Sequence, residues 1–320
     1  MARFGNFVPS GVIPACLLPF DADFAIDVAE YRKHLRDVAA VRGLTALTTN
    51  AHASEVHACS LDEQRQILDI TVDEVGDRLP VIAGVYAESS LLAADIAAMS
   101  ERGGASALLV FPPNSMIMGG QLRPEMALAH LKRIADATDL PLILFQYPLA
   151  GGLGYPLETL LRILEEVPSV RAIKDWCNDP MLHERHIRTL KSLPRPVNVL
   201  STHSAWLMSS LVLGCHGLLS GAGSVIADLQ AALWRAVEAK DLAAAQAIND
   251  RIYPLAQAFY APPFLDMHNR MKEALVLLGR LKRAVVRPPL VKLPTAEIAR
   301  IKAALEAAQV TRAGAVHRAA

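Results

Sequence analysis

The sequence predicts an α/β fold, a TIM (β/α)8 barrel with a C-terminal helical extension. Eight short apolar segments alternate with segments whose apolar residues recur every three or four positions. Most of the short segments are apolar throughout, which is typical of parallel strands that are covered on both faces. Eight repeated β/α units favour a closed barrel over an open doubly wound sheet, which is the alternative for this pattern.

The eight expected strands lie within the first 220 residues of the 320-residue chain. They are residues 11–18, 44–49, 80–84, 106–111, 141–146, 169–174, 197–201 and 216–220. The segments between them show helical periodicity, for example at Val28, Tyr31, Leu35 and Val38. Strand, helix and next parallel strand form the right-handed unit from which such barrels are built.

The strand pattern ends near residue 225. Helical patterns follow at residues 226–238, 241–258, 264–278 and 295–308, interrupted by Pro262-Pro263 and Pro288-Pro289. Proline pairs end helices because each proline fixes its own backbone and restricts the preceding residue. We therefore expect a barrel over residues 1–225 and a C-terminal helical domain over residues 226–320, with a frayed tail from residue 310.

Composition excludes several classes of function. The chain has 32 basic and 32 acidic residues, so its charge predicts no binding to nucleic acid or to an anionic membrane. Its apolar stretches are far shorter than the roughly 20 residues of a membrane span, and its N-terminus lacks the apolar core of a secretory signal. The four cysteines form no CxxC pair, which fits free thiols in a reducing, cytoplasmic compartment.

Function in a β/α barrel lies on the loops at the carboxyl ends of the strands. Lys174 ends the apolar segment Val170-Arg171-Ala172-Ile173-Lys174, so its side chain would project into the barrel mouth. Desolvation there would lower the pKa of the amine toward neutrality, as a nucleophilic lysine requires. A solvated lysine at a strand terminus is the alternative on this observation alone.

Several motifs resemble the dihydrodipicolinate synthase/N-acetylneuraminate lyase family. Lys174-Asp175-Trp176-Cys177-Asn178-Asp179 resembles the family's Lys-Asp/Glu-small-Ser-Gly-Asp motif. Ala51-His52-Ala53-Ser54-Glu55 takes the positions of its Gly-Thr-Thr-Gly-Glu loop after strand two. Ser201-Thr202-His203-Ser204, Gly214-Cys215-His216-Gly217 and Met271-Lys272-Glu273-Ala274-Leu275 resemble later family segments in the same order. The resemblance covers nearly the whole chain.

The resemblance implies a class I lyase. Lys174 would form a Schiff base with pyruvate or another 2-oxo acid, and the protonated imine would serve as an electron sink for deprotonation or carbon–carbon cleavage. Ala53 and Ser54 map to the loop that holds the substrate carboxylate. Thr202, Leu219 and Gly221 map to other parts of the pocket. The family needs no organic cofactor or metal, and its members are homodimers or homotetramers.

The chain departs from the family at its proton-transfer positions. Phe145, in Phe145-Gln146-Tyr147-Pro148, stands where the family has its catalytic tyrosine and cannot carry a proton. Tyr147 lies two residues later and could reach the same region, because residues i and i+2 of a strand face the same side. A packed tyrosine is the alternative. His52 replaces a loop threonine and could act as a general acid or base, or be a polar loop residue.

Two further losses concern the second substrate. The tyrosine that a neighbouring subunit lends would fall in Phe111-Pro112-Pro113-Asn114, which contains none. The arginine that grips the carboxylate of the aldehyde maps to Ala150, so an acidic partner loses its main anchor. These losses argue against dihydrodipicolinate synthesis itself. They leave open a hydratase-aldolase, a sugar-acid dehydratase and a 2-oxo-acid aldolase, with an aldehyde or sugar acid as partner.

Three other interpretations stay open. A metal-dependent aldolase would draw on His52, Glu55 and His57, whereas His183 and His186 are expected on the outer, solvated face of a helix. A non-catalytic protein could keep the lysine and sense a 2-oxo acid. A phosphate could also bind as in an anion nest after strand eight, at Gly221-Ala222-Gly223-Ser224.

Overall fold

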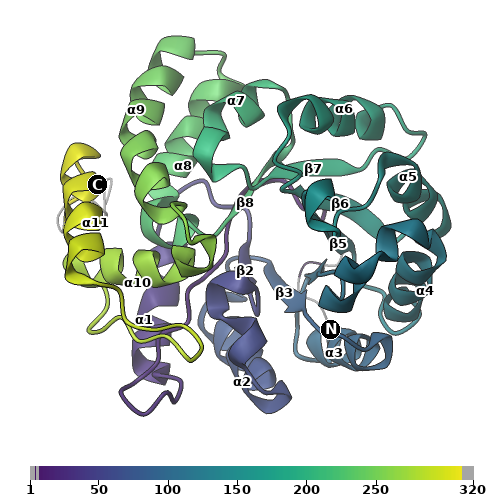
Figure 1. The fold of residues 1–320 in the computed structure, drawn as a ribbon, viewed down its shortest axis with the longest axis horizontal. Coiled ribbons are helices and arrows are strands. Elements are labelled where there is room, and N and C mark those ends of the chain that lie inside the picture. The colour runs from purple at the N-terminus through teal and green to yellow at the C-terminus, as the bar shows by residue number, and fades with distance from the viewer. Residues whose placement is uncertain (1–3, 5–6, 312–320) are drawn as a thin grey trace.

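The computed structural model describes residue 4 and residues 7–311. Its strands form one parallel sheet that curls into a barrel surrounded by helices (Figure 1). The strand order is β1-β8-β7-β6-β5-β4-β3-β2, and the parallel bridges Val12↔Leu44 and Ala15↔Thr48 close the circle between the first strand and the second. The predicted TIM barrel is therefore confirmed.

Each observed strand overlaps a predicted one. All residues of β1–β5 and β8 are buried, because one face of the sheet fills the barrel and the other is covered by helices. This double burial explains the uniformly apolar segments of the sequence. The strands are β1 (Gly11–Pro14), β2 (Leu47–Thr49), β3 (Val81–Val85), β4 (Ala107–Val110), β5 (Leu142–Gln146), β6 (Val170–Asp175), β7 (Asn198–Ser201) and β8 (Gly217–Ser220).

Helices follow the strands around the barrel. Their starts are set by local chemistry: α2, for example, begins with a capping box in which Ser60 and Glu63 bond each other's backbone N–H groups. The helices around the sheet are α1 (Val28–Ala39), α2 (Leu61–Val75), α3 (Ser90–Arg102), α4 (Pro124–Ala135), α5 (Leu157–Glu166), α6 (Pro180–Lys191), α7 (Leu207–Val212) and α8 (Gly223–Glu238).

Three more helices gather on one side of the barrel, next to α1 and α8 (Figure 1). They are α9 (Leu242–Phe259), α10 (Met267–Leu277), which follows the short 3-10 turn η7 (Phe264–Asp266), and α11 (Thr295–Ala307). The helices expected after residue 225 are thus confirmed, although α8 begins at Gly223. A domain boundary at residue 225 remains a prediction, and residues 312–320 of the expected tail lie outside the described residues. None of the described helices has the length and apolarity of a membrane span.

The loop after β2 is held in an unusual conformation. Asn50 and Glu55, at its two ends, both have left-handed backbones, with φ of 51° and 52°. Gly84 of β3 permits this path, since a Cβ at that position would lie 1.7 Å from the carbonyl oxygen of Asn50. Non-glycine residues in this region cost free energy and persist where the surroundings enforce them, often at functional sites.

A buried ion pair ties this loop to the C-terminal helices. The Lys272 ammonium of α10 bonds the Glu55 carboxylate and the carbonyl oxygen of Val285, and both charged side chains are almost wholly buried. Glu55 also accepts a hydrogen bond of 3.0 Å from the backbone N–H of Arg287. The Arg287 guanidinium in turn pairs with Glu63. The charges of the loop and of the C-terminal region therefore neutralise each other away from water.

Replacing Lys272 with methionine should lower the free energy of unfolding by about 3–5 kcal/mol, because Glu55 would be left buried without its cation. Urea denaturation measures the change. The matched control is Glu184→Gln, which removes an exposed pair with Arg188 and should cost less than about 1 kcal/mol. A Lys272→Met variant as stable as that control would show that the pair does not hold the loop.

Candidate active site

Lys174 lies at the carboxyl end of β6, between Phe145 of β5 and Leu200 of β7. Its side chain is 6% exposed, and its Nζ lies 4.1 Å from the centroid of the Phe145 ring. Burial lowers the pKa of the amine to about 7, because the cation loses its hydration. The structure thus places Lys174 in the barrel mouth, as the sequence predicts, and burial favours the neutral form of its amine.

The amine faces a cavity of about 410 Å³. Such a volume lies within the range of small-molecule sites. Loops after most of the strands contribute to its wall, and the C-terminal helical region closes one side. The lining residues are Ala15, Ala51, His52, Ala53, Glu55, His57, Tyr86, Phe145, Lys174, Trp176, Thr202, Gly221, Tyr260, Phe264, Leu265, Met267, His268 and Leu290.

His52 of this wall is hydrogen-bonded to Tyr147, with 2.6 Å between Nε2 and the hydroxyl oxygen, but Tyr147 is not itself a lining residue. Burial and then the nearby Lys174 charge lower the pKa of His52 to about 3, so the ring is neutral. Burial raises the pKa of Tyr147, so its hydroxyl keeps its proton. With the hydroxyl protonated and the ring neutral, the tautomer of His52 sets which of the two groups donates. The Tyr147 ring also packs against Phe145, with 4.3 Å between centroids.

The structure brings together most of the residues that the sequence singled out. His52, Ala53, Phe145, Lys174, Thr202 and Gly221 all line the cavity. Leu219 is fully buried within β8 and is not part of the lining. Ser54 is also buried, its hydroxyl donating to the carbonyl oxygen of Cys16 and its N–H to that of Ala51. Both polar groups of Ser54 are thus engaged away from the cavity, and it cannot hold a carboxylate in this arrangement.

Sequence reasoning missed much of the outer wall. Tyr86, Tyr260, Phe264 and His268 line the cavity, and only the fold brings their segments together. Trp176 could have been found, because it lies two residues after Lys174 and a strand that continues points alternate residues to one side. The Trp176 ring stacks on Phe264, with 5.0 Å between centroids and 13° between planes.

Beneath Lys174, a buried polar network surrounds Asp175. His183 and His186 each place Nδ1 within hydrogen-bond distance of Asp175 Oδ2, at 2.9 and 2.8 Å, and both are fully buried. The expectation that these histidines lie on the solvated face of their helix is wrong, because α6 turns them toward the sheet. Burial opposes ionisation of Asp175, but hydrogen bonds from both histidines hold its pKa below the ordinary value.

This network contains the one candidate metal cluster among the described residues. Ligand atoms of Asp175, Cys177, His183 and His203 lie within 4.8 Å of one another. Both ring nitrogens of His183 already have hydrogen-bond partners, Asp175 and the Ser210 hydroxyl at 2.7 Å. The hydrogen bonds account for this histidine without an ion. Of the residues on which the alternative of a metal-dependent aldolase would draw, His52 pairs with Tyr147 and Glu55 with Lys272.

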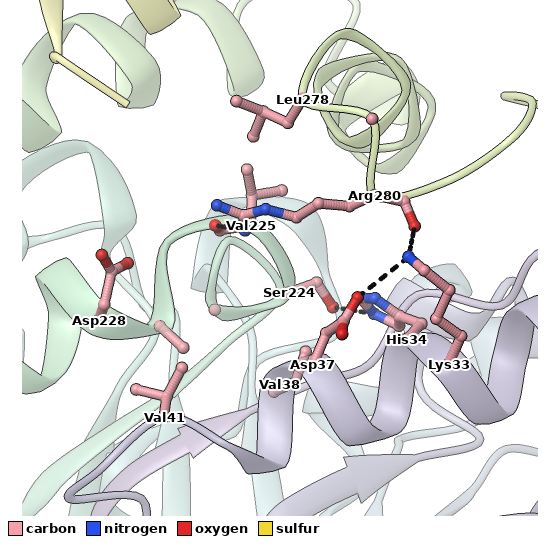
Figure 2. Close-up of a pocket in the computed structure, with 13 residues that line it drawn as sticks. Lys33, His34, Asp37, Val38, Val41, Ser224, Val225, Asp228, Leu278 and Arg280 are labelled. Atoms are coloured by element: carbon pink, nitrogen blue, oxygen red, sulfur yellow. Dashed lines mark hydrogen bonds and ion pairs between the residues drawn. The ribbon is translucent and has the colours of Figure 1, made fainter. Parts of the chain in front are cut away.

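A second cavity of about 480 Å³ lies between α1, α8 and the turn after α10 (Figure 2). Its lysine, Lys33, donates to Asp37 and to the carbonyl oxygen of Arg280, so this amine is paired rather than desolvated. Ser224, in the segment considered as a phosphate nest, instead donates to the carbonyl of Ala15 and accepts from Leu17 N–H, each at 2.9 Å. Ser224 therefore connects the segment after β1 with the start of α8.

Comparison with known proteins agrees with this architecture. The model of the dihydrodipicolinate synthetase family matches residues 8–308. A 4-hydroxy-tetrahydrodipicolinate synthase of Kineococcus radiotolerans is 31% identical over 299 residues, covering 92% of this chain and 91% of its own. A DapA-like lyase of Halobacterium salinarum, itself uncharacterized, is 30% identical over 272 residues, covering 84% of each chain.

Solved structures have the same fold. YagE, a prophage protein of Escherichia coli K12 in the dihydrodipicolinic acid synthase family, was crystallised with pyruvate. It superimposes with a TM-score of 0.85 at 23% identity, covering 94% of this chain and 98% of its own. Dihydrodipicolinate synthase of Thermotoga maritima gives 0.85 at 23%, covering 95% and 99%. By the extent of the family match and the identity to its relatives, the chain belongs to the dihydrodipicolinate synthetase family.

Proposed function

We propose that this protein is a lyase that forms a Schiff base between Lys174 and pyruvate or a closely related 2-oxo acid. The observation that carries the proposal is the desolvated amine of Lys174, which lines the cavity of about 410 Å³ and has a pKa of about 7. A neutral amine is the nucleophile that imine formation needs. Family membership supports the same chemistry, and YagE was crystallised with pyruvate.

The proposed reaction begins with attack of the Lys174 amine on the ketone carbon, followed by loss of one water to give a protonated imine. That cation draws electrons from the neighbouring carbon, which then loses a proton or breaks a carbon–carbon bond. The backbone of Ala53, in the η1 turn (His52–Ser54) beside the amine, is the candidate holder of the substrate carboxylate. Ser54 is left out of this role because its hydroxyl and N–H bond other groups.

The Tyr147–His52 pair is the candidate for proton transfer. Tyr147 keeps its proton and His52 is neutral, so the hydroxyl can give its proton to a developing alkoxide and regain one through the imidazole. This assignment would let Tyr147 take over the work of the tyrosine that Phe145 replaces. Phe145 itself would serve to keep water from the amine and to pack against the Tyr147 ring.

We infer that the chain is not a synthase of dihydrodipicolinate, although several relatives carry that name. Ala150, at the position of the arginine that would grip an acidic aldehyde, is exposed and does not line the cavity. The rate with pyruvate and L-aspartate 4-semialdehyde is the measurement, and it should fall well below the rate with an uncharged aldehyde. The four cysteines are unpaired, which supports a reducing, cytoplasmic location.

We also infer a homo-oligomer. The segment after β4 presents four large apolar side chains to solvent, a group that monomers seldom expose together. They are Ile117, Met118, Leu122 and Met126, at 58%, 83%, 84% and 47% exposed. We expect a second copy of the chain to cover these four side chains.

Borohydride added with pyruvate should form an irreversible adduct on Lys174, found by peptide mapping. The trapping rate should rise about tenfold from pH 6 to pH 8 and then level off, because an amine with a pKa near 7 loses its proton over that range. A lysine of ordinary pKa would keep gaining reactivity above pH 9.

The Lys174→Ala variant should trap no pyruvate, whereas Lys33→Ala, which removes the paired lysine of the second cavity, should behave as wild type. A Lys174→Ala variant that still forms the adduct would end the proposal. Trapping without turnover of any aldehyde or sugar acid would identify the protein as a 2-oxo-acid sensor.

A Tyr147→Phe variant should lose about 10²–10⁴-fold in kcat for the carbon–carbon step, because a positioned acid or base contributes on this scale. Pyruvate trapping should survive, since the amine is unchanged. Tyr155→Phe is the matched control, a buried tyrosine of the same region, because the tyrosine that pairs with His52 is Tyr147. Unchanged turnover of the Tyr147→Phe variant would remove Tyr147 from the mechanism.

Met118→Glu combined with Leu122→Glu should convert the oligomer into monomers at micromolar concentration, as measured by sedimentation velocity. The charges would be buried unpaired in the proposed interface. Leu242→Glu, at an exposed leucine of α9, should leave assembly intact. A wild-type protein that sediments as a monomer would contradict the inference.

A further inference from the structure

The outer part of the active-site cavity is built from ring side chains, a group that we call the aromatic rim. Trp176 and Phe264 stack nearly in parallel, and the Tyr260 ring lies 5.7 Å from Phe264 at 29°. Tyr86 also lines the cavity and is in edge contact with His52, at 5.9 Å between ring centroids. The aromatic rim consists of Tyr86, Trp176, Tyr260 and Phe264, all of them partly exposed.

The rim is accompanied by aliphatic side chains and not by cations. Leu265, Met267 and Leu290 extend the apolar wall. Apart from histidines, the charged residues that line the cavity in the described part of the chain are Lys174 and Glu55. Lys174 is the proposed nucleophile, and Glu55 is already neutralised by Lys272.

The histidines of the cavity do not supply the missing charge. Burial lowers the pKa of His52 to about 3 and the pKa of His268 well below its ordinary value. Burial also lowers the pKa of the third lining histidine, the more exposed His57, so the neutral form is favoured at all three rings. A second substrate with its own carboxylate would have to bury that anion beside aromatic rings without a cationic partner, which is strongly unfavourable. A flat apolar substrate would bury its surface there and stack on the exposed ring faces.

We propose that the second substrate of this site is an uncharged aldehyde that carries an aromatic ring, with the ring seated on the aromatic rim. The inference rests on the imine chemistry proposed above and adds to it the class of partner. Trp176 lies two residues beyond Lys174, so the rim begins next to the reacting centre. Phe264 and Leu265, on the η7 turn, would contact the aromatic ring of the aldehyde.

The step conserves atoms and electrons. A C–H bond of the imine's methyl carbon breaks first, and its proton passes to His52, which leaves the enamine. The enamine carbon attacks the carbonyl carbon of the aldehyde, one carbon–carbon bond forms, and the aldehyde oxygen takes the proton of the Tyr147 hydroxyl. His52 then returns its proton to Tyr147 along their hydrogen bond. One water then hydrolyses the imine, replacing the water lost when the imine formed. The product is a 4-hydroxy-2-oxo acid with the ring on carbon four, and cleavage follows the same path in reverse. No oxidant or reductant takes part.

The test compares two probes with pyruvate as the common substrate: benzaldehyde, and L-aspartate 4-semialdehyde, which carries a carboxylate and an ammonium group. We expect wild-type kcat/KM to be at least tenfold higher for benzaldehyde. Phe264→Ala and Trp176→Ala should each reduce that ratio at least tenfold. Phe264→Leu, which retains bulk without a ring, should reduce it less than Phe264→Ala. Tyr253→Ala removes an exposed tyrosine of α9 outside the cavity and should leave the ratio unchanged.

A gain-of-function variant covers the case in which an alanine variant folds poorly. Leu265 is 61% exposed and lines the cavity, so Leu265→Arg can supply a cation with little disturbance. It should raise kcat/KM for L-aspartate 4-semialdehyde at least tenfold. Pyruvate trapping by borohydride is measured on every preparation. Loss of trapping in the wild type would refute the imine chemistry. Intact trapping with equal or better use of L-aspartate 4-semialdehyde by the wild type would overturn the partner class alone.

Discussion

The desolvation of the Lys174 amine is the constraint on which the rest of this site depends. A lysine cation in water keeps its proton at neutral pH. The amine of Lys174 becomes a nucleophile because burial removes most of its hydration and no ion pair to it is found among the described carboxylates. Desolvation is the sole cause of the shift in its pKa, with the Phe145 ring 4.1 Å from Nζ. The neighbouring side chains matter to the chemistry in two ways: they exclude water from the amine, and they leave it without an ion pair.

Two acidic side chains near the amine, Asp175 and Glu55, bind other partners. Asp175, the next residue along the strand, faces away from the cavity and binds His183 and His186 beneath the barrel mouth. Glu55 lines the cavity but is neutralised by Lys272 from α10. Were either carboxylate to bond Lys174, the ammonium would be stabilised and the amine would cease to be a nucleophile. The buried networks thus contribute to the chemistry because they keep the carboxylates of Asp175 and Glu55 from pairing with the Lys174 amine.

The C-terminal helices complete the site as well as covering it. They supply Lys272 to the strained loop after β2, and Tyr260, Phe264 and His268 to the cavity wall. Their apolar and neutral contribution keeps the dielectric low around the amine, and the same property disfavours an anionic partner. One physical cause, exclusion of water and charge, therefore links the reactivity proposed for Lys174 with the substrate class proposed for the rim.

The sequence by itself determined the barrel, the order of its elements and the location of Lys174 at a strand end. These follow from local periodicity, because doubly covered parallel strands must be apolar along their whole length. It also indicated that Tyr147 could lie near the position left by Phe145. It could not determine which way a side chain turns at a loop or on a helix: Ser54 was expected in the cavity and bonds Cys16, while His183 and His186 were expected in solvent and are buried.

Only the tertiary structure decided the pairing of His52 with Tyr147, the neutralisation of Glu55 and the aromatic rim. The physical reason is that these depend on contacts between residues far apart in the chain, such as Lys272 with Glu55 or Phe264 with Trp176. No local sequence pattern predicts such a contact, because the sequence around one residue does not indicate which distant residue will lie against it. Desolvation likewise belongs to the assembled cavity: the position of an amine can be read from a strand, but its pKa is set by everything that closes around it.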